Sequence, residues 1–208
     1  MEQKKRSLGA VERDEFLRAA WRLVVAGQID AERLVFVDEM GTNVSLSPLY
    51  AWSRKGERAF GSAPRNWGNN VTLLASITRE GLGPCLAVEG ATTTTREVFK
   101  AYLQRVLAPS LVPGQVVVMD NLSAHKGERV RELIEQRGCE LLYLPPYSPD
   151  FNPIEQAFSK VKGLMRATEA RTREALIEAM GVALSAVSAR DARGFFGHCG
   201  YSSMAQLL

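Results

Sequence analysis

Two short apolar runs, each ending at an aspartate, constrain the fold of this chain more than any other feature. Leu34–Val37 ends at Asp38, and Val116–Met119 ends at Asp120. Neither run alternates apolar and polar residues, which is typical of strands buried on both faces in a parallel sheet. We therefore expect the two strands to be adjacent and parallel. Their aspartates would then emerge at the same edge of the sheet, where ligands commonly bind in α/β folds.

The other segments predict a mixed α/β domain. Further strands are expected at 71–77, 85–88 and 141–144, and helices at about 98–107, 127–137, 154–165 and 172–190. Strands come first, and helices and strands alternate afterwards. That order predicts a mixed sheet flanked by helices, as in ribonuclease H-like domains. The glycine-bearing residues 194–200 are expected to be loosely structured.

The segment before the first strand predicts a helix. Its apolar stripe consists of Phe16, Ala19, Ala20, Leu23 and Val24. We interpret this segment as a lead-in helix that packs on the core through that stripe.

Composition excludes several classes of protein. With 208 residues, 46% apolar and 24% charged, the chain can bury a full core and has the balance of a soluble globular protein. It has no apolar run long enough to cross a bilayer and no signal peptide, so we expect a cytoplasmic protein without membrane contact. Cys85, Cys139 and Cys199 lack zinc-type spacing and are expected to be reduced and mostly buried. A net charge of +3 permits nucleic-acid binding without requiring it.

A third carboxylate completes a candidate metal site. Glu155 follows Asp120 after thirty-four intervening residues and stands at the start of a predicted helix. Hard carboxylate oxygens suit Mg²⁺ or Mn²⁺, which keep open positions for water and phosphate. Two such ions about 3.5–4 Å apart can activate a nucleophile and stabilise a leaving oxygen. Asp38, Asp120 and Glu155 together indicate metal-dependent phosphoryl transfer on DNA.

Local roles compete with catalytic ones at this site. Asn152 as N-cap, with Pro153 and Glu155 behind it, has the spacing of a capping box, in which Glu155 would simply bond the cap backbone. Asn121 would orient Asp120 or contact DNA. His125 would contact the scissile phosphate or hold its own loop through a hydrogen bond.

Residues 52–67 combine cations with aromatic rings in a glycine- and proline-bearing loop. Cations suit phosphates, and flat rings stack on bases or wedge between them. The alternative is a solvated loop whose aromatic rings pack into the core. The candidate DNA-binding residues are Arg54, Lys55, Arg58, Arg65, Trp52 and Trp67.

Three motifs give the chain a resemblance to a known family. They are FVDE at 36–39, DNLSAH at 120–125 and PYSPDFNPIE at 146–155. With the thirty-four-residue gap between the second and third acids, they resemble DDE transposases of the mariner superfamily, especially its bacterial insertion-sequence branch. The resemblance implies a ribonuclease H-like catalytic domain over 34–168, preceded by a linker helix in 1–33 and followed by a C-terminal helix and tail in 169–208.

The resemblance also implies a mechanism and partners. Asp38, Asp120 and Glu155 would hold two Mg²⁺ or Mn²⁺ ions, with Asn121, His125 and Asn152 supporting them. Similar enzymes cleave double-stranded DNA at transposon ends and join the freed 3′-hydroxyl to target DNA, commonly at TA. We expect a homodimer on DNA, located with the nucleoid in the cytoplasm.

Members of that family carry N-terminal helix-turn-helix modules that bind the element ends. We expect this chain to lack them, and a separate helix-turn-helix chain would then be a partner. Two alternatives stay open: a ribonuclease H-like nuclease without strand transfer, and an inactive DNA-binding remnant of a transposase.

Overall fold

A five-stranded sheet forms the centre of the computed structural model, which describes residues 12–66, 68–90, 95–121 and 127–201. The strand order is β3-β2-β1-β4-β5. The strands are β1 (Leu34–Thr42), β2 (Val71–Thr78), β3 (Gly81–Glu89), β4 (Val116–Met119) and β5 (Glu140–Tyr143).

The predicted neighbouring strands are adjacent and parallel. β1 pairs with β4 in parallel and with β2 in antiparallel orientation, and β5 adds a further parallel strand beside β4. Val37 pairs with Met119, so Asp38 and Asp120 each follow a paired residue. The sheet is therefore mixed, and the two aspartates stand at equivalent positions of neighbouring strands.

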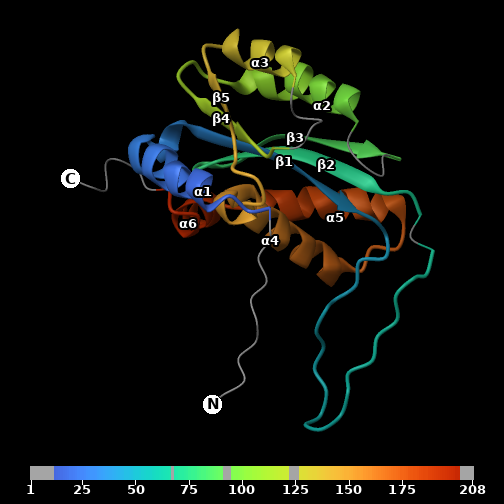
Figure 1. Ribbon diagram of the computed structural model, residues 1–208. Coiled ribbons are helices and arrows are strands. Elements are labelled where there is room, and N and C mark those ends of the chain that lie inside the picture. The colour runs from blue at the N-terminus through green and yellow to red at the C-terminus, as the bar shows by residue number, and fades with distance from the viewer. Residues whose placement is uncertain (1–11, 67, 91–94, 122–126, 202–208) are drawn as a thin grey trace, which may run out of the picture.

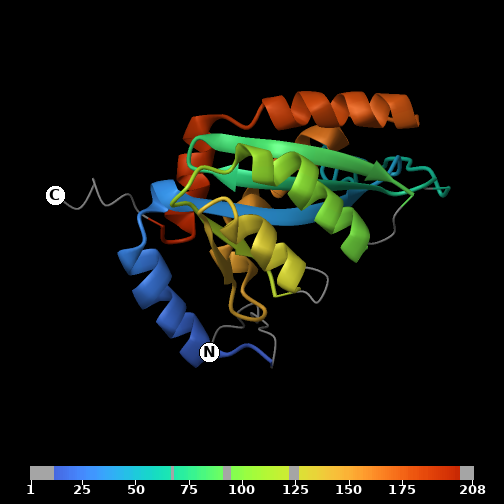
Figure 2. The same cartoon turned by 90° about the horizontal axis from the view of Figure 1, so that it is seen from above.

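Helices cover both faces of the sheet, as predicted (Figure 1). In Figure 2, which views the molecule from the side of α2 and α3, these two helices lie over the strands. Successive residues of β1 and β4 contribute alternately to two apolar clusters. Phe36 and Val118 pack towards the other face, whereas Val37 and Met119 pack on the side of α2 and α3. The helices are α1 (Glu15–Trp21), α2 (Arg96–Tyr102), α3 (Glu128–Glu135), α4 (Pro153–Thr168), α5 (Arg173–Ser185) and α6 (Ala189–His198).

Short helical turns extend or connect these elements. Two π-helical segments continue α1 and α2, and the three-residue 3-10 turn η5 leads into α4. The segments are η1 (Arg22–Ala26), η2 (Ala31–Arg33), η3 (Leu103–Leu107), η4 (Ala108–Ser110) and η5 (Pro149–Phe151).

The predicted helix over 172–190 is two helices. Ser188 caps the second one: its hydroxyl accepts a hydrogen bond from the Asp191 backbone, and the Asp191 carboxylate accepts one from the Ser188 backbone. The C-cap of α5 is Ala186, and the capping box at Ser188 starts α6 only two residues later. The expectation of a loosely structured tail is therefore wrong for residues up to His198, because α6 packs Phe196 fully into the core.

The stripe expected to bury the N-terminal helix faces solvent instead. Phe16 is 81% exposed and Leu23 is 71% exposed. The buried face carries Arg18, Trp21 and Val25. These positions also have helical spacing, so the periodicity was correct but the inward face was wrong.

Residues 43–70 join β1 to β2 as a long arm that projects beyond the sheet (Figure 1). Its described part contains no helix or strand. All three cysteines are free; Cys139 and Cys199 are buried, whereas Cys85 is exposed. None of the described helices has the length and apolar character that a membrane span requires.

Replacing a core phenylalanine should cost far more stability than replacing one in the arm. Phe36 is fully buried and packs edge-on against Phe196 with ring centroids 5.4 Å apart. We expect Phe36→Ala to lower the free energy of unfolding by about 3–5 kcal/mol. Phe60→Ala, at a side chain that is 89% exposed, should change it by less than about 0.5 kcal/mol. Urea denaturation followed by circular dichroism measures both, and equal losses would contradict the assignment of the core.

Candidate active site

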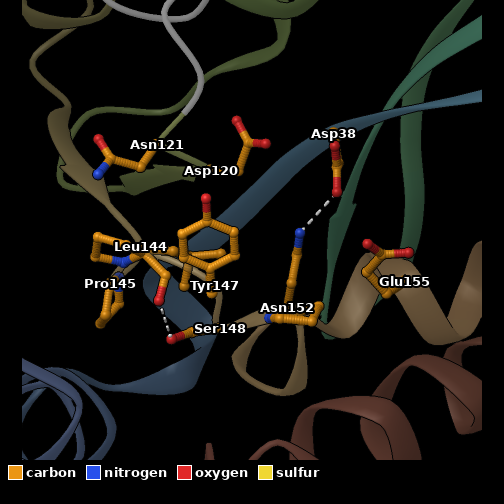
Figure 3. A pocket seen from close by; sticks show the side chains of 11 residues that line it. Asp38, Asp120, Asn121, Leu144, Pro145, Tyr147, Ser148, Asn152 and Glu155 are labelled. Atoms are coloured by element: carbon orange, nitrogen blue, oxygen red, sulfur yellow. Dashed lines mark hydrogen bonds between the residues drawn. The ribbon is translucent and has the colours of Figure 1, made fainter. Parts of the chain in front are cut away.

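The three acids singled out from the sequence line one pocket. Asp38 comes from β1, Asp120 follows β4, and Glu155 lies in the first turn of α4 (Figure 3). The pocket opens at the edge of the sheet where the carboxyl ends of parallel strands meet, the usual ligand position in α/β folds. Its remaining lining residues are Asn121, Leu144, Pro145, Pro146, Tyr147, Ser148, Pro149 and Asn152.

Asp38 is the most deeply placed of the three acids. It is 7% exposed, and both carboxylate oxygens accept hydrogen bonds. The Glu39 backbone N–H donates to Oδ1 at 2.7 Å, and the Asn152 side-chain amide donates to Oδ2 at 2.8 Å (Figure 3). A buried carboxylate requires such donors, because burial without them is costly. The orientation of Asp38 is thus set by one contact within β1 and one from the start of α4.

Asn152 does not cap the helix that it precedes. Its backbone occupies the N-cap position of α4, but its side chain makes no capping hydrogen bond. The predicted capping box is therefore wrong at this position. The amide reaches Asp38 instead, while its Oδ1 atom is buried without a hydrogen bond from any described residue. Tertiary contact with a buried carboxylate has replaced the local bond that the sequence pattern predicted.

Glu155 is directed into the pocket by the packing of its neighbours. Pro153 and Ile154 are buried, whereas Glu155 is exposed at the pocket wall. Its backbone N–H donates to the Asn152 carbonyl at 3.2 Å, which holds the first turn of α4. The carboxylate therefore stands on a rigid element and faces the open side of the pocket.

The donor set fits Mg²⁺ or Mn²⁺. Asp38, Asp120 and Glu155 offer hard oxygen ligands around an open pocket, the arrangement these ions use while retaining water and phosphate. Within the described ranges, no three acidic, histidine or cysteine side chains are close enough to hold a single ion as a group. Two ions, each bound by one or two of the carboxylates, do not require such a group.

Tyr147 and Ser148 belong to the site, although the sequence analysis did not single them out. Tyr147 lines the pocket, is 58% exposed and has a positive φ of 52°. An aromatic residue in the left-handed region is uncommon and costs free energy. The signal in the sequence was an aromatic residue placed between prolines in the PPYSP run.

The residues predicted to contact DNA lie partly at the pocket and partly on the arm. Asn121 lines the pocket and is exposed. The arm carries the exposed cations Arg54, Lys55, Arg58 and Arg65, none of which lines the pocket. Trp52 is fully exposed and Phe60 nearly so, so the alternative in which these rings pack into the core is wrong. His125 and Trp67 lie outside the described residues.

Sequence reasoning also missed an ion pair between the buried Arg18 and the half-exposed Asp150, which stands two residues before Asn152. Arg18 of α1 donates two hydrogen bonds to Asp150 of η5, from Nη1 to Oδ1 at 2.9 Å and from Nη2 to Oδ2 at 2.6 Å. These bonds hold the pKa of Asp150 below its ordinary value and raise the pKa of Arg18. The detectable signal was an arginine at helical spacing from Trp21 and Val25 on the face that is buried.

Substituting Asn152 with serine distinguishes the two roles of this residue. Serine is as good an N-cap as asparagine, so a capping role would leave stability nearly unchanged. The serine side chain is too short to reach Asp38, so we expect Asn152→Ser and Asn152→Ala each to lose about 1–3 kcal/mol of unfolding free energy. Asn121→Ala, at an exposed position, should change it by less than about 0.5 kcal/mol. Chemical denaturation measures all three, and retained stability in Asn152→Ser would restore the capping role.

Comparisons with known proteins identify the family of this chain. A family model described as "DDE superfamily endonuclease" matches residues 33–177. The Tcb1 transposable-element transposase of Caenorhabditis briggsae is 28% identical over 123 residues, which are 55% of this chain and 44% of that protein. The chain thus matches less than half of the length of this curated relative.

Solved structures of the Mos1 mariner transposase share the fold. A Mos1 paired-end complex with Mn has a TM-score of 0.73 at 16% identity, covering 96% of this chain and 64% of that chain. The separate Mos1 catalytic domain has a TM-score of 0.58 at 15% identity, covering 89% and 84%. The mixed sheet flanked by helices is thus the ribonuclease H-like fold of that domain. Because the family match covers more than half of the chain and includes Asp38, Asp120 and Glu155, this protein belongs to the DDE superfamily endonuclease family.

Proposed function

We propose that this chain is the catalytic domain of a transposase that cleaves DNA at the ends of a mobile element and joins them to new DNA. The observation that carries the proposal is the single pocket shared by Asp38, Asp120 and Glu155, which are distant in sequence. Family membership supports it, as does the likeness to proteins described as Tcb1 and Mos1 transposases.

In this proposal the three carboxylates bind two Mg²⁺ or Mn²⁺ ions. The ions would supply Lewis-acid activation of the attacking oxygen and charge stabilisation at the scissile phosphate. Asp38 presents its carboxylate in one orientation because the Glu39 N–H and the Asn152 amide hold its two oxygens. Asp120 and Glu155 approach from the neighbouring strand and from α4, so that the phosphate of the substrate enters between rigid elements. Asn121 and Tyr147, at the rim, would contact the DNA on either side of that phosphate.

The reaction that we propose has two parts. The pocket first hydrolyses DNA at the element end and then joins the freed 3′-hydroxyl to target DNA, for which TA dinucleotides are the expected sites. The Mos1 structures described as paired-end and strand-transfer complexes support end binding and strand transfer for a protein of the same fold. We also propose that the element is a bacterial insertion sequence, that the enzyme acts as a homodimer at the nucleoid, and that a separate helix-turn-helix chain supplies end recognition.

The arm is the proposed DNA contact outside the pocket. Arg54, Lys55 and Arg58 are exposed on it, and Trp52 presents a fully exposed ring beside them. Exposed cations neutralise phosphates, and an aromatic ring that makes no core contact is available for stacking on bases.

Removing one carboxylate should abolish cleavage without unfolding the protein. Metal ligation contributes several kcal/mol of transition-state stabilisation, so we expect Asp120→Ala to reduce the rate of metal-dependent DNA cleavage by at least about 10³-fold. Glu140→Ala, at an exposed position at the opposite end of the sheet, should retain the rate. The assay uses plasmid DNA that carries the sequences flanking the gene, with Mg²⁺ or Mn²⁺, and circular dichroism checks the fold.

Unchanged cleavage in Asp120→Ala would defeat the assignment of the site. Cleavage without joining, in a strand-transfer assay with plasmid target, would identify a nuclease in place of a transposase. DNA binding without any cleavage by the unaltered chain, also when the proposed helix-turn-helix chain is added, would identify an inactive remnant.

Neutralising the arm should weaken DNA binding and its dependence on salt. The slope of log K against log salt concentration is negative, and each phosphate contact that is lost reduces its magnitude by about 0.9. We expect the triple variant Arg54→Ala, Lys55→Ala and Arg58→Ala to bind duplex DNA more weakly, with a flatter slope. The control makes the same change of charge at three exposed cations outside the arm, which are Arg105 of η3, Arg131 of α3 and Arg137 just after α3. Fluorescence anisotropy at several salt concentrations measures both, and equal slopes would return the arm to the role of a solvated loop.

A further inference from the structure

The turn that leads into α4 is held by an arginine from the N-terminal helix. Arg18 has no exposed side-chain surface, yet its guanidinium meets Asp150 through two parallel hydrogen bonds of 2.9 and 2.6 Å. Its Cζ atom also lies 4.3 Å from the centre of the Phe151 ring. Arg13 approaches the same carboxylate at 3.6 Å, from a partly exposed position. A bidentate contact of this kind fixes both the position and the rotation of the carboxylate.

A second contact reaches the same turn from the C-terminal end of the described chain. The Trp21 indole N–H donates to the Tyr201 hydroxyl at 2.8 Å, and that hydroxyl donates to the Phe151 carbonyl at 2.7 Å. All three side chains are buried, Tyr201 at 2% and Phe151 at 5% exposed. Residues far apart in the sequence thus converge on η5, which has only three residues of its own.

This turn is directly connected to the active site. Its backbone closes through two hydrogen bonds, from Phe151 N–H to the Ser148 carbonyl and from Asn152 N–H to the Pro149 carbonyl. The next contact is from the Asn152 amide to Asp38, and the Asn152 carbonyl accepts the backbone N–H of Glu155. A shift of Asp150 and Phe151 would therefore move both the donor that orients Asp38 and the first turn that carries Glu155.

Stability alone does not account for an arginine at this position. Burial of the Arg18 guanidinium costs desolvation free energy, and its partner Asp150 is half exposed, so the pair contributes little net stability compared with a well-packed apolar side chain at position 18. What it provides is a defined geometry for its partner. Asp150 is followed within two residues by the amide that holds Asp38, so this geometry is imposed at the catalytic pocket.

We propose that Arg18 is a positioning residue of the active site, which acts through Asp150 and η5 to hold Asn152 and Glu155 in the arrangement that binds metal. The inference rests on the proposed function, because it takes the pocket to be a site for divalent ions. If Arg18 has this role, α1 contributes to the geometry of the active site as well as to the stability of the fold.

The test compares two ion pairs that both attach another helix to the segment carrying Glu155. Arg18→Met keeps an unbranched side chain that reaches about as far as the arginine Nε atom, and it removes the guanidinium. Asp150 is half exposed, so water can replace the lost partner and the fold should survive. The control is Lys160→Met, which breaks the 2.7 Å pair between α4 and Asp191 of α6 without touching η5. Both variants should lower the melting temperature.

Binding of Mn²⁺ alone, measured by isothermal titration calorimetry without DNA, separates the two variants. Loss of a residue that orients ligands typically weakens metal binding by about 10–100-fold, so we expect Arg18→Met to raise the Kd for Mn²⁺ by at least about tenfold. Lys160→Met should stay within about twofold of the unaltered chain, because its pair has no contact with the site. Unchanged Mn²⁺ affinity in Arg18→Met, or an equal loss in Lys160→Met, would overturn the proposal.

Two further variants keep the outcome interpretable. If Arg18→Met does not fold, Asp150→Asn, which retains the shape of the side chain, should weaken Mn²⁺ binding in the same way, and normal affinity in that variant overturns the proposal. Asp120→Ala tests the proposed function separately. If Asp120→Ala binds Mn²⁺ normally, the metal site itself is wrong. If Asp120→Ala loses Mn²⁺ and Arg18→Met does not, only the positioning role fails.

Discussion

The parallel, in-register pairing of β1 with β4 is the constraint on which the site depends. Val37 pairs with Met119 as the last pair of the parallel ladder, and an aspartate follows on each side: Asp38 within β1, and Asp120 directly after β4. The pairing is possible because both strands are apolar on both faces and are covered by helices on each side. A shift of one residue would turn one aspartate towards the opposite face and bury a charge in the core. The chemistry of the pocket and the packing of the core therefore impose the same register.

The third acid reaches the pocket by a different route. Glu155 lies on a helix rather than on a strand, and the position of that helix depends on the turn before it. This turn is anchored at three points: Asp150 to Arg18, the Phe151 carbonyl to Tyr201, and Asn152 to Asp38. Sheet pairing thus positions Asp38 and Asp120. Side chains from α1 and from Tyr201 position the turn that precedes Glu155.

The environment of Asp38 explains why the side chain of Asn152 does not make the N-cap hydrogen bond that its local sequence pattern indicates. An N-cap bond from Asn152 would satisfy one exposed backbone N–H, which water can satisfy equally well. A donor to the buried Asp38 carboxylate has no such substitute, so the side chain bonds there. The same balance applies in α1 and η1, whose buried face carries Arg18, the partner of Asp150, while the apolar Phe16 and Leu23 remain exposed.

The sequence by itself determined the strands, their neighbours and the three acids. Strand burial and the spacing of apolar residues are local properties that can be seen in Leu34–Val37 and Val116–Met119, and the edge position of Asp38 and Asp120 follows from them. Tertiary structure alone decided the contacts of Asn152, the inward face of α1, and the pairing of Arg18 with Asp150 across 132 positions of the chain. The physical reason is that periodicity reports which residues share a face, whereas the partner of a buried polar group depends on which donor or acceptor the fold brings to it.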